Sequence, residues 1–238
     1  MSFDSLLGGR VQHAQAADGH RTGIEPVLLA AFVPARAGER VLEGGTGAGA
    51  ALLCLASRVP GVLGVGLELN PEQAARAREN FALNGFDTLV VQHGDLATIE
   101  LESRFDHAMA NPPWHTPSAT ASPDGARALA KQARPGLFAL WADRLARTLR
   151  HRGTLSFITA TATLSECLAA FSQAGCGSHT ILPLWPREGR PSKLVLLQGV
   201  KGGRGPTRVM PGLVLHAPGG GYTAAAEAVL RDAHALRP

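Results

Sequence analysis

The chain has 238 residues, a length typical of one domain with its own core, and 45% of its residues are hydrophobic. It has no run of about 18 apolar residues, which a membrane-spanning helix requires, and its start lacks the basic-then-apolar layout of a signal peptide. We therefore expect one cytoplasmic domain. The cysteines and histidines follow no disulfide or metal-ligand spacing, so the sequence indicates neither a disulfide framework nor a metal.

The formal charge is only +4, but basic residues gather in three clusters along the chain. Such clusters can contact a polyanion, although each one alone is also typical of a solvated surface. The first cluster is Arg144, Arg147, Arg150 and Arg152, the second is Arg187, Arg190 and Lys193, and the third is Lys201, Arg204 and Arg208.

Short apolar runs alternate with helical patterns along most of the chain. The second helix has an Asn-Pro start and an Asn-Gly stop, which are typical boundary signals. The βαβαβ order predicts an α/β fold with a parallel sheet covered on both faces. Two closing strands are too close together for a helical crossover, so we expect them to be antiparallel. The predicted strands cover 40–45, 62–69, 88–94, 105–110, 153–160, 176–185 and 192–200, and the helices cover 48–59, 70–85 and 136–151.

The first predicted strand leads into a glycine-rich segment, "EGGTGAG" at 43–49. Gly45, Gly47 and Gly49 allow a sharp turn and let a ligand approach the backbone closely. The spacing also satisfies the dinucleotide-binding pattern, so the glycines alone do not identify the ligand. The carboxylate of Glu43 would repel a pyrophosphate, whereas it would attract the ammonium of a ligand such as S-adenosylmethionine. A triphosphate-binding loop is excluded because no Gly-Lys-Ser/Thr follows.

Two more polar signals follow the second and third predicted strands. Glu68 closes the second strand, where a carboxylate can accept hydrogen bonds from both ribose hydroxyls. That ribose occurs in NAD and in S-adenosylmethionine, so Glu68 supports both ligands equally. Gly94 and Asp95 close the third strand, where a side-chain oxygen could accept a hydrogen bond from the adenine amino group. Gly-Asp is also typical of an ordinary turn.

The fourth strand ends in Asn111, Pro112, Pro113 and Trp114. The Asn111 side-chain oxygen and the Pro112 carbonyl are two acceptors, and the prolines restrict the turn that presents them. Two convergent acceptors suit an NH₂ group, while the indole of Trp114 suits a flat ring stacked beside it. The long polar segment over 115–136 follows directly, and loops of that length are often functional.

Together these motifs resemble the Rossmann-like S-adenosylmethionine-dependent methyltransferases that methylate exocyclic amino or amide nitrogens. The segments 6–61 and 211–231 are further similar to bacterial tRNA (adenine-N6)-methyltransferases, which modify an adenosine beside the anticodon of a valine tRNA. The resemblance implies a seven-stranded, mostly parallel sheet with an antiparallel last strand. It also implies one methyltransferase domain over 1–238, with a cofactor-covering segment at 1–38, a core at 39–200 and a C-terminal extension at 201–238.

The resemblance implies S-adenosyl-L-methionine as the cofactor. It places Arg21, Gly23 and Glu25 in the segment over the cofactor and adds Leu69 of "LEL" to the binding residues. The chain departs from the usual pattern at two positions. Glu43 stands where Asp is more usual, and Trp114 stands where Tyr or Phe is more usual, so the larger indole can alter which base is accepted.

We expect N6-methylation of an adenine in the anticodon region of tRNA, by direct in-line methyl transfer. Asn111 and Pro112 would aim the amino group, His115 could take the leaving proton, and neither a metal nor a membrane is required. The target base must be flipped out or already unpaired to reach such a pocket. The basic clusters would then contact phosphates, which adds affinity without sequence specificity.

Three alternatives remain open. A protein-glutamine N5-methyltransferase uses the same Asn-Pro-Pro-aromatic logic, but it typically carries an N-terminal helical domain, and only 39 residues precede the first predicted strand. An rRNA guanine-N2 methyltransferase is harder to separate by these motifs. A non-catalytic RNA-binding module on the same fold would have no chemical need for Glu43, Glu68, Asp95 and Asn111 together.

Overall fold

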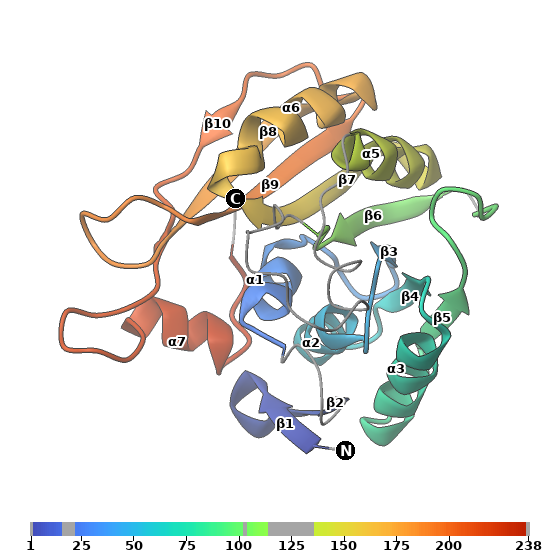
Figure 1. Cartoon of the computed structure of the whole chain (residues 1–238), viewed down its shortest axis with the longest axis horizontal. Coiled ribbons are helices and arrows are strands. Elements are labelled where there is room, and N and C mark those ends of the chain that lie inside the picture. Colours follow the sequence, from blue (N-terminus) through green and yellow to red (C-terminus); the bar gives the residue numbers. More distant parts are fainter. Residues whose placement is uncertain (1, 16–21, 102–103, 114–135, 237–238) are drawn as a thin grey trace, which may run out of the picture.

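The structure is a computed structural model that describes residues 2–15, 22–101, 104–113 and 136–236, and a central sheet organises it (Figure 1). Within the described residues the sheet has nine strands, in the order β10-β8-β9-β7-β6-β3-β4-β5, and β11 also pairs with β8. The strands are β3 (Arg40–Gly44), β4 (Leu63–Glu68), β5 (Leu89–His93), β6 (Phe105–Ala110), β7 (Leu149–Ala160), β8 (Cys176–Trp185), β9 (Leu194–Lys201), β10 (Arg208–Val209) and β11 (Leu213–Val214).

All pairs in this sheet are parallel except those that β9 makes with β7 and β8. The prediction of a mostly parallel sheet whose last long strand is antiparallel is therefore confirmed. The predicted number of seven strands is too low, because the two-residue strands β10 and β11 add to the sheet along β8. Strands this short carry no period that a sequence pattern can detect.

Helices cover both faces of the sheet because neighbouring residues of each strand point to opposite sides. Val41 and Met109 pack against α1 (Glu25–Phe32), α2 (Ala50–Arg58) and α3 (Pro71–Leu83) on one face. Leu42 and Ala108 pack on the other face, against α5 (Leu137–Thr148) and α6 (Leu164–Gln173). Figure 1 shows these two helical layers. None of the helices in the described ranges is long and apolar enough to span a membrane.

The sequence signals predicted the start of α3 correctly, but they predicted the end of α5 three residues too late. Asn70 caps α3 as expected, since its Oδ1 accepts the backbone N–H groups of Glu72 and Gln73 at 2.9 and 3.2 Å. The helix predicted over 136–151 ends at Thr148, and β7 begins at the next residue. Arg150 there forms an ion pair with Asp106 on β6, which holds this part of the chain on the sheet.

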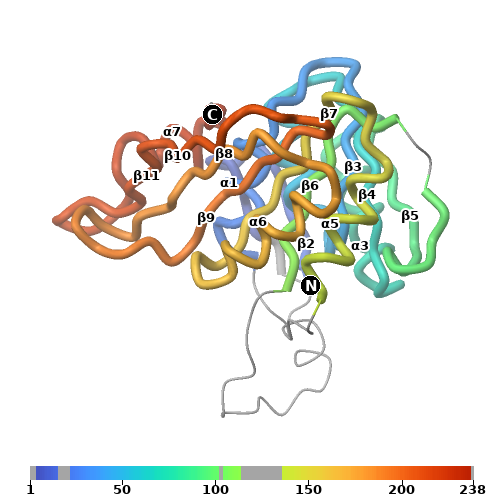
Figure 2. Tube along the Cα trace, turned by 90° about the horizontal axis from the view of Figure 1, so that it is seen from above, coloured from blue at the N-terminus to red at the C-terminus, as the bar shows by residue number. Residues whose placement is uncertain are grey.

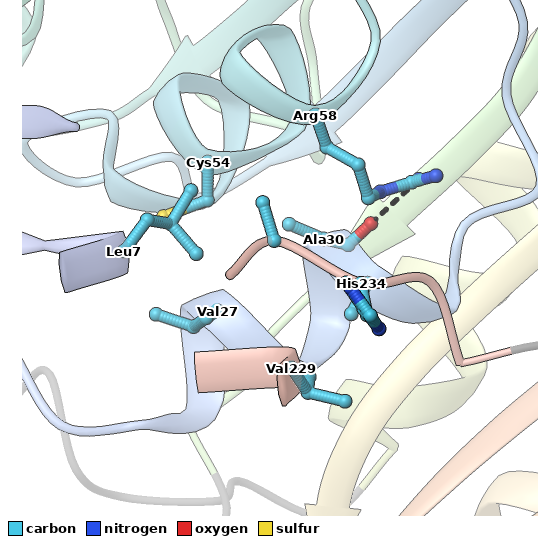
Figure 3. A pocket seen from close by; sticks show the side chains of 9 residues that line it. Leu7, Val27, Ala30, Cys54, Arg58, Val229 and His234 are labelled. Atoms are coloured by element: carbon cyan, nitrogen blue, oxygen red, sulfur yellow. Dashed lines mark hydrogen bonds between the residues drawn. The ribbon is translucent and has the colours of Figure 1, made fainter. Parts of the chain in front are cut away.

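The two ends of the chain pack together beside α2. Several elements of these ends were not predicted from the sequence. They are the hairpin of β1 (Ser2–Leu6) and β2 (Val11–Gln15), the short helix η1 (Leu7–Gly9), α1 and α7 (Ala224–Leu230). Figure 3 shows side chains from η1, α1, α2 and α7 meeting at one junction. There the Nη2 of Arg58 donates to the carbonyls of Ala30 and Val33 at 2.9 and 2.6 Å and so caps the end of α1.

Candidate functional site

The predicted site residues share one level at the carboxyl edge of the sheet. Gly44 on β3 is the Cα partner of both Leu67 on β4 and Ala110 on β6. The next residues along the chain, Gly45, Glu68 and Asn111, therefore lie at one level, and adjacent strands are about 4.8 Å apart. Glu68 in turn pairs with His93, the last residue of β5, so Gly94 and Asp95 follow at the same edge. Open α/β sheets bind ligands at this edge.

Glu43, the first residue of the glycine-rich segment, is a buried carboxylic acid. Its side chain is 3% exposed, and its Oε2 accepts the hydroxyl of Thr46 at 2.6 Å. Burial raises the pKa of Glu43 to about 8, the hydrogen bond from Thr46 opposes that rise, and the charge of Glu68 adds to it. Within the described ranges Glu43 has no cationic partner. A positive ligand group beside Glu43 would therefore favour its ionised form.

The glycines of this segment serve different purposes. All three have a positive φ, which is 66° for Gly45, 56° for Gly47 and 89° for Gly49. A Cβ on Gly45 would collide with Trp141, and a Cβ on Gly49 would collide with Phe81, so both positions are closed by packing. A Cβ on Gly47 would meet no atom within 4 Å. Gly47 is therefore the glycine at which the backbone remains open to a ligand.

Glu68 joins the glycine-rich segment to the start of α3. One carboxylate oxygen accepts the backbone N–H of Gly47 at 2.8 Å, and the other accepts that of Asn70 at 2.8 Å. Each oxygen retains a further acceptor position, as the predicted ribose contact requires. The adjacent Leu69 is 63% exposed and offers an apolar surface at the same edge.

Gly94 and Asp95 form the turn that leaves β5. The N–H of Gly94 donates to the carbonyl of Glu68 at 2.9 Å, and Asp95 Oδ1 accepts the N–H of Ala97 at 2.8 Å. The ordinary turn function of this pair is therefore present. Asp95 is exposed, and its proposed contact with an adenine amino group stays a prediction.

Asn111 follows β6 beside the glycine-rich segment. Its side chain is half-buried and makes no hydrogen bond to any residue in the described part of the chain, while Pro112 is buried and Pro113 half-buried behind it. Trp114, with His115 and nearly all of the 115–136 segment, lies outside the described residues, as does Arg21. Gly23 is exposed just before α1, whose first residue is Glu25, and its place over the cofactor stays a prediction.

Asn80 is a supporting residue that sequence reasoning missed. It is fully buried on α3, and its Oδ1 accepts the N–H of Ala14 on β2 at 2.8 Å. Its Nδ2 donates to the carbonyl of Ala14 at 3.1 Å and to that of Ala48 in the glycine-rich segment at 2.9 Å. One amide thus ties the N-terminal hairpin to the ligand-binding edge. The only sequence signal was a polar residue within a largely apolar helix face.

The site contains the groups that a positively charged amino-acid nucleoside requires. A buried acid precedes a glycine whose backbone is open, and a carboxylate with spare acceptor positions closes β4. The amide side chain after β6 makes no hydrogen bond within the described residues. The described ranges hold no group of three or more His, Cys, Asp or Glu side chains that could bind a metal ion. The arrangement is suited to positioning two bound molecules against one another.

Comparison with known proteins shows what this chain is similar to. Residues 24–139 match the model of the methyltransferase small domain. The chain is 29% identical over 208 residues to a tRNA1(Val) (adenine(37)-N6)-methyltransferase of Aeromonas hydrophila, and the match covers 85% of each chain. It is 34% identical over 149 residues to an enzyme of the same name from Porphyromonas gingivalis, where the match covers 58% of each chain and thus less than two thirds of that relative.

The fold also matches solved structures. A protein of Agrobacterium tumefaciens described as a predicted O-methyltransferase superposes with a TM-score of 0.76 and 23% sequence identity. The match covers 90% of this chain and 99% of that one, so the likeness of fold extends over most of the chain. The chain is therefore similar in sequence to tRNA1(Val) (adenine(37)-N6)-methyltransferases, resembles the methyltransferase small domain over residues 24–139, and shares its fold with a solved structure described as a predicted O-methyltransferase.

Proposed function

We propose that the chain acts as one S-adenosylmethionine-dependent methyltransferase that methylates N6 of an adenine in tRNA, in the anticodon region. The observation that carries this proposal is the common level of Gly45, Glu68 and Asn111 on three adjacent strands. This register brings a cofactor-type loop and an amide acceptor within contact of one small volume. The relatives named as tRNA1(Val) (adenine(37)-N6)-methyltransferases support the choice of tRNA and of adenine.

The residues at the edge divide into two groups by what they would hold. Glu43 would pair with the ammonium of S-adenosylmethionine, Glu68 would accept the ribose hydroxyls, and Asp95 would contact the adenine. The open backbone at Gly47 lets the cofactor lie close to the chain. When bound, S-adenosylmethionine supplies a methyl group that its sulfonium has already activated.

Asn111 and Pro112 would position the nucleophile. The amino lone pair of adenine is delocalised into the ring, and hydrogen bonds from the NH₂ group to two fixed acceptors draw the nitrogen toward tetrahedral geometry. Pro112 is buried, so the turn has little freedom to lose when substrate binds. Trp114 would stack on the flipped base and hold it in plane with these acceptors.

The reaction product tests the proposal. We would incubate the protein with labelled S-adenosylmethionine and unmodified tRNA, digest the RNA to nucleosides and identify the methylated one. N6-methyladenosine is expected. N2-methylguanosine or label in protein glutamine would instead favour one of the alternative methyltransferases, and binding of tRNA without methylation would favour the non-catalytic module.

Asn111→Ala tests the mechanism separately from the cofactor site. It removes one acceptor from the target amino group, so turnover should fall by about 10²–10³ while S-adenosylmethionine affinity is unchanged. Trp114→Ala should lower RNA affinity and turnover together, by about 1–3 kcal/mol of stacking, and Trp114→Phe should recover most of that loss. Full adenine methylation by Asn111→Ala would reduce the motif to a strand-capping turn.

A further inference from the structure

The three basic clusters lie at different places on the sheet. Leu149, which lies between Arg147 and Arg150, pairs with Phe105 at the start of β6, so this part of the first cluster lies at the amino edge, opposite the candidate site. Three of its four members are engaged: Arg144 donates to the carbonyls of Leu96 and Ile99, Arg147 pairs with Asp143, and Arg150 pairs with Asp106. These cations are held by the chain itself.

The third cluster is also remote from the carboxyl edge. Lys201 ends the antiparallel β9 and pairs with Cys176, the first residue of β8, which again is the amino edge. Its Nζ donates to the carbonyl of Ala174 at 2.8 Å. Arg208 pairs with Thr180, near the middle of β8, and its guanidinium donates to the Thr180 hydroxyl.

The second cluster lies at the same edge as Asn111. Ala110 pairs with Phe157, and Phe157 pairs with Leu197, so these three residues mark one level across β6, β7 and β9. Lys193 directly precedes the antiparallel β9, four residues before Leu197. For an untwisted sheet this places Lys193 about 10 Å beyond Asn111 along the strands and about 10 Å to the side. A few nucleotides span that separation.

The second cluster surrounds a hollow of about 350 Å³, which we call the basic turn pocket. Its lining comes from the 186–193 turn and from His216 in the segment that joins β11 to α7. Figures 1 and 2 show these two segments side by side. The N–H of His216 donates to the Pro186 carbonyl at 3.1 Å and so holds the two sides together. The volume is within the range of pockets that take a small-molecule ligand. The lining residues are Pro186, Arg187, Arg190, Pro191, Lys193 and His216.

The pocket combines unpaired positive charge with an aromatic pair. Arg187, Arg190 and Lys193 form no ion pair with any described residue, and the turn contains one acid, Glu188, so its net charge is 3 − 1 = +2. All four charged side chains are exposed. The His216 ring stacks on Tyr222, with centroids 5.0 Å apart and an angle of 19° between the planes.

We propose that the basic turn pocket holds a phosphate-bearing nucleotide of the RNA substrate, a few positions from the target base. This inference rests on the proposed function. Cations provide affinity for the phosphate backbone, and a rigid ring beside them gives a nucleotide a flat surface to contact. Among the three basic clusters, this one shares the edge at which the target base must enter, so it can set the register of the RNA relative to Asn111.

The test compares two triple variants that remove the same charge from opposite edges. The first is Arg187→Gln, Arg190→Gln and Lys193→Gln; the matched control is Arg147→Gln, Arg152→Gln and Arg204→Gln. For each protein we would measure tRNA affinity over a range of salt concentrations, kcat and KM for tRNA, and S-adenosylmethionine affinity by calorimetry. Lys193→Arg serves as a variant that keeps the charge.

The pocket variant should bind tRNA about tenfold or more weakly at moderate salt, and its slope of log K against log salt should fall by about 2. The loss should appear in KM, with kcat at saturating tRNA and cofactor affinity retained, and Lys193→Arg should resemble the parent. The control variant should change affinity less than about twofold. Equal losses in both variants, or none in the pocket variant, would overturn this inference while leaving adenine methylation by the parent intact. A parent that does not methylate tRNA would instead overturn the proposed function.

Discussion

If Glu43 pairs with the cofactor ammonium, as we propose, its burial should make cofactor binding depend on pH. The side chain is 3% exposed, and burial raises its pKa to about 8. Contact with a ligand ammonium requires the carboxylate, so binding at pH 7 should release about 0.9 proton per site, the fraction protonated for a pKa of about 8. The same relation predicts that S-adenosylmethionine affinity rises about ninefold from pH 6 to pH 7, a range in which an α-amino group stays largely protonated.

The measurement is calorimetry in two buffers of different ionisation enthalpy, which reports the number of protons released. Glu43→Gln keeps the side-chain volume and an oxygen to accept the Thr46 hydroxyl, but it cannot ionise. The variant should release no proton, lose the pH slope and bind about tenfold more weakly at pH 8, because a charge-assisted contact becomes a neutral one. A parent that binds with the same affinity at pH 6 and pH 7, or an unchanged slope in Glu43→Gln, would refute the assignment.

The same acid should affect the stability of the ligand-free protein. The pKa of Glu43 is raised from 4.5 to about 8 on folding, so between these values the unfolded chain has lost the proton that the folded chain keeps. The contribution of Glu43 to the free energy of unfolding is therefore fully present below pH 4.5, and it is lost as the pH rises from there through about 8. Urea unfolding should show a stability that falls by up to several kcal/mol across this window, and Glu43→Gln should flatten the fall.

Four further substitutions test the scaffold of the protein. Asn80→Leu should cost about 2–4 kcal/mol in urea unfolding and weaken cofactor binding, because backbone groups of the N-terminal hairpin and the glycine-rich segment lose their partner; unchanged stability would contradict its bridging role. Arg58→Met should lower the free energy of unfolding by about 1–3 kcal/mol through the uncapped end of α1, and a neutral result would show that water replaces the guanidinium. Gly47→Ala should cost about 1–2 kcal/mol from its left-handed backbone alone, whereas Gly49→Ala should cost more because its Cβ meets Phe81; equal melting temperatures would refute that distinction.

The sequence by itself determined the parallel core and the edge that carries the site. Strand and helix alternation is a local property, and the Asn-Pro start of α3 appears in the structure as a side-chain cap on two N–H groups. Once consecutive strands are parallel, their carboxyl ends must meet at one edge, so Gly45, Glu68, Gly94 and Asn111 could be brought together without coordinates. The strand register confirms that placement.

Tertiary structure decided which groups support that edge and which surround it. Asn80 lies 66 residues from Ala14 in the chain, and no local period encodes such a hydrogen bond. Other contacts also join residues far apart in the chain. Examples are the hydrogen bond of Gly47 to Glu68, the packing of Trp141 on Gly45, and the pairing of β10 and β11 with β8. The second and third basic clusters are alike in sequence, and they lie at opposite edges because β9, which runs between them, is antiparallel to β7 and β8. The 186–193 turn before β9 therefore lies at the edge of Asn111, whereas Lys201 at the end of β9 lies at the opposite edge. The position of β9 in the sheet depends on contacts between distant segments, which no local sequence pattern encodes.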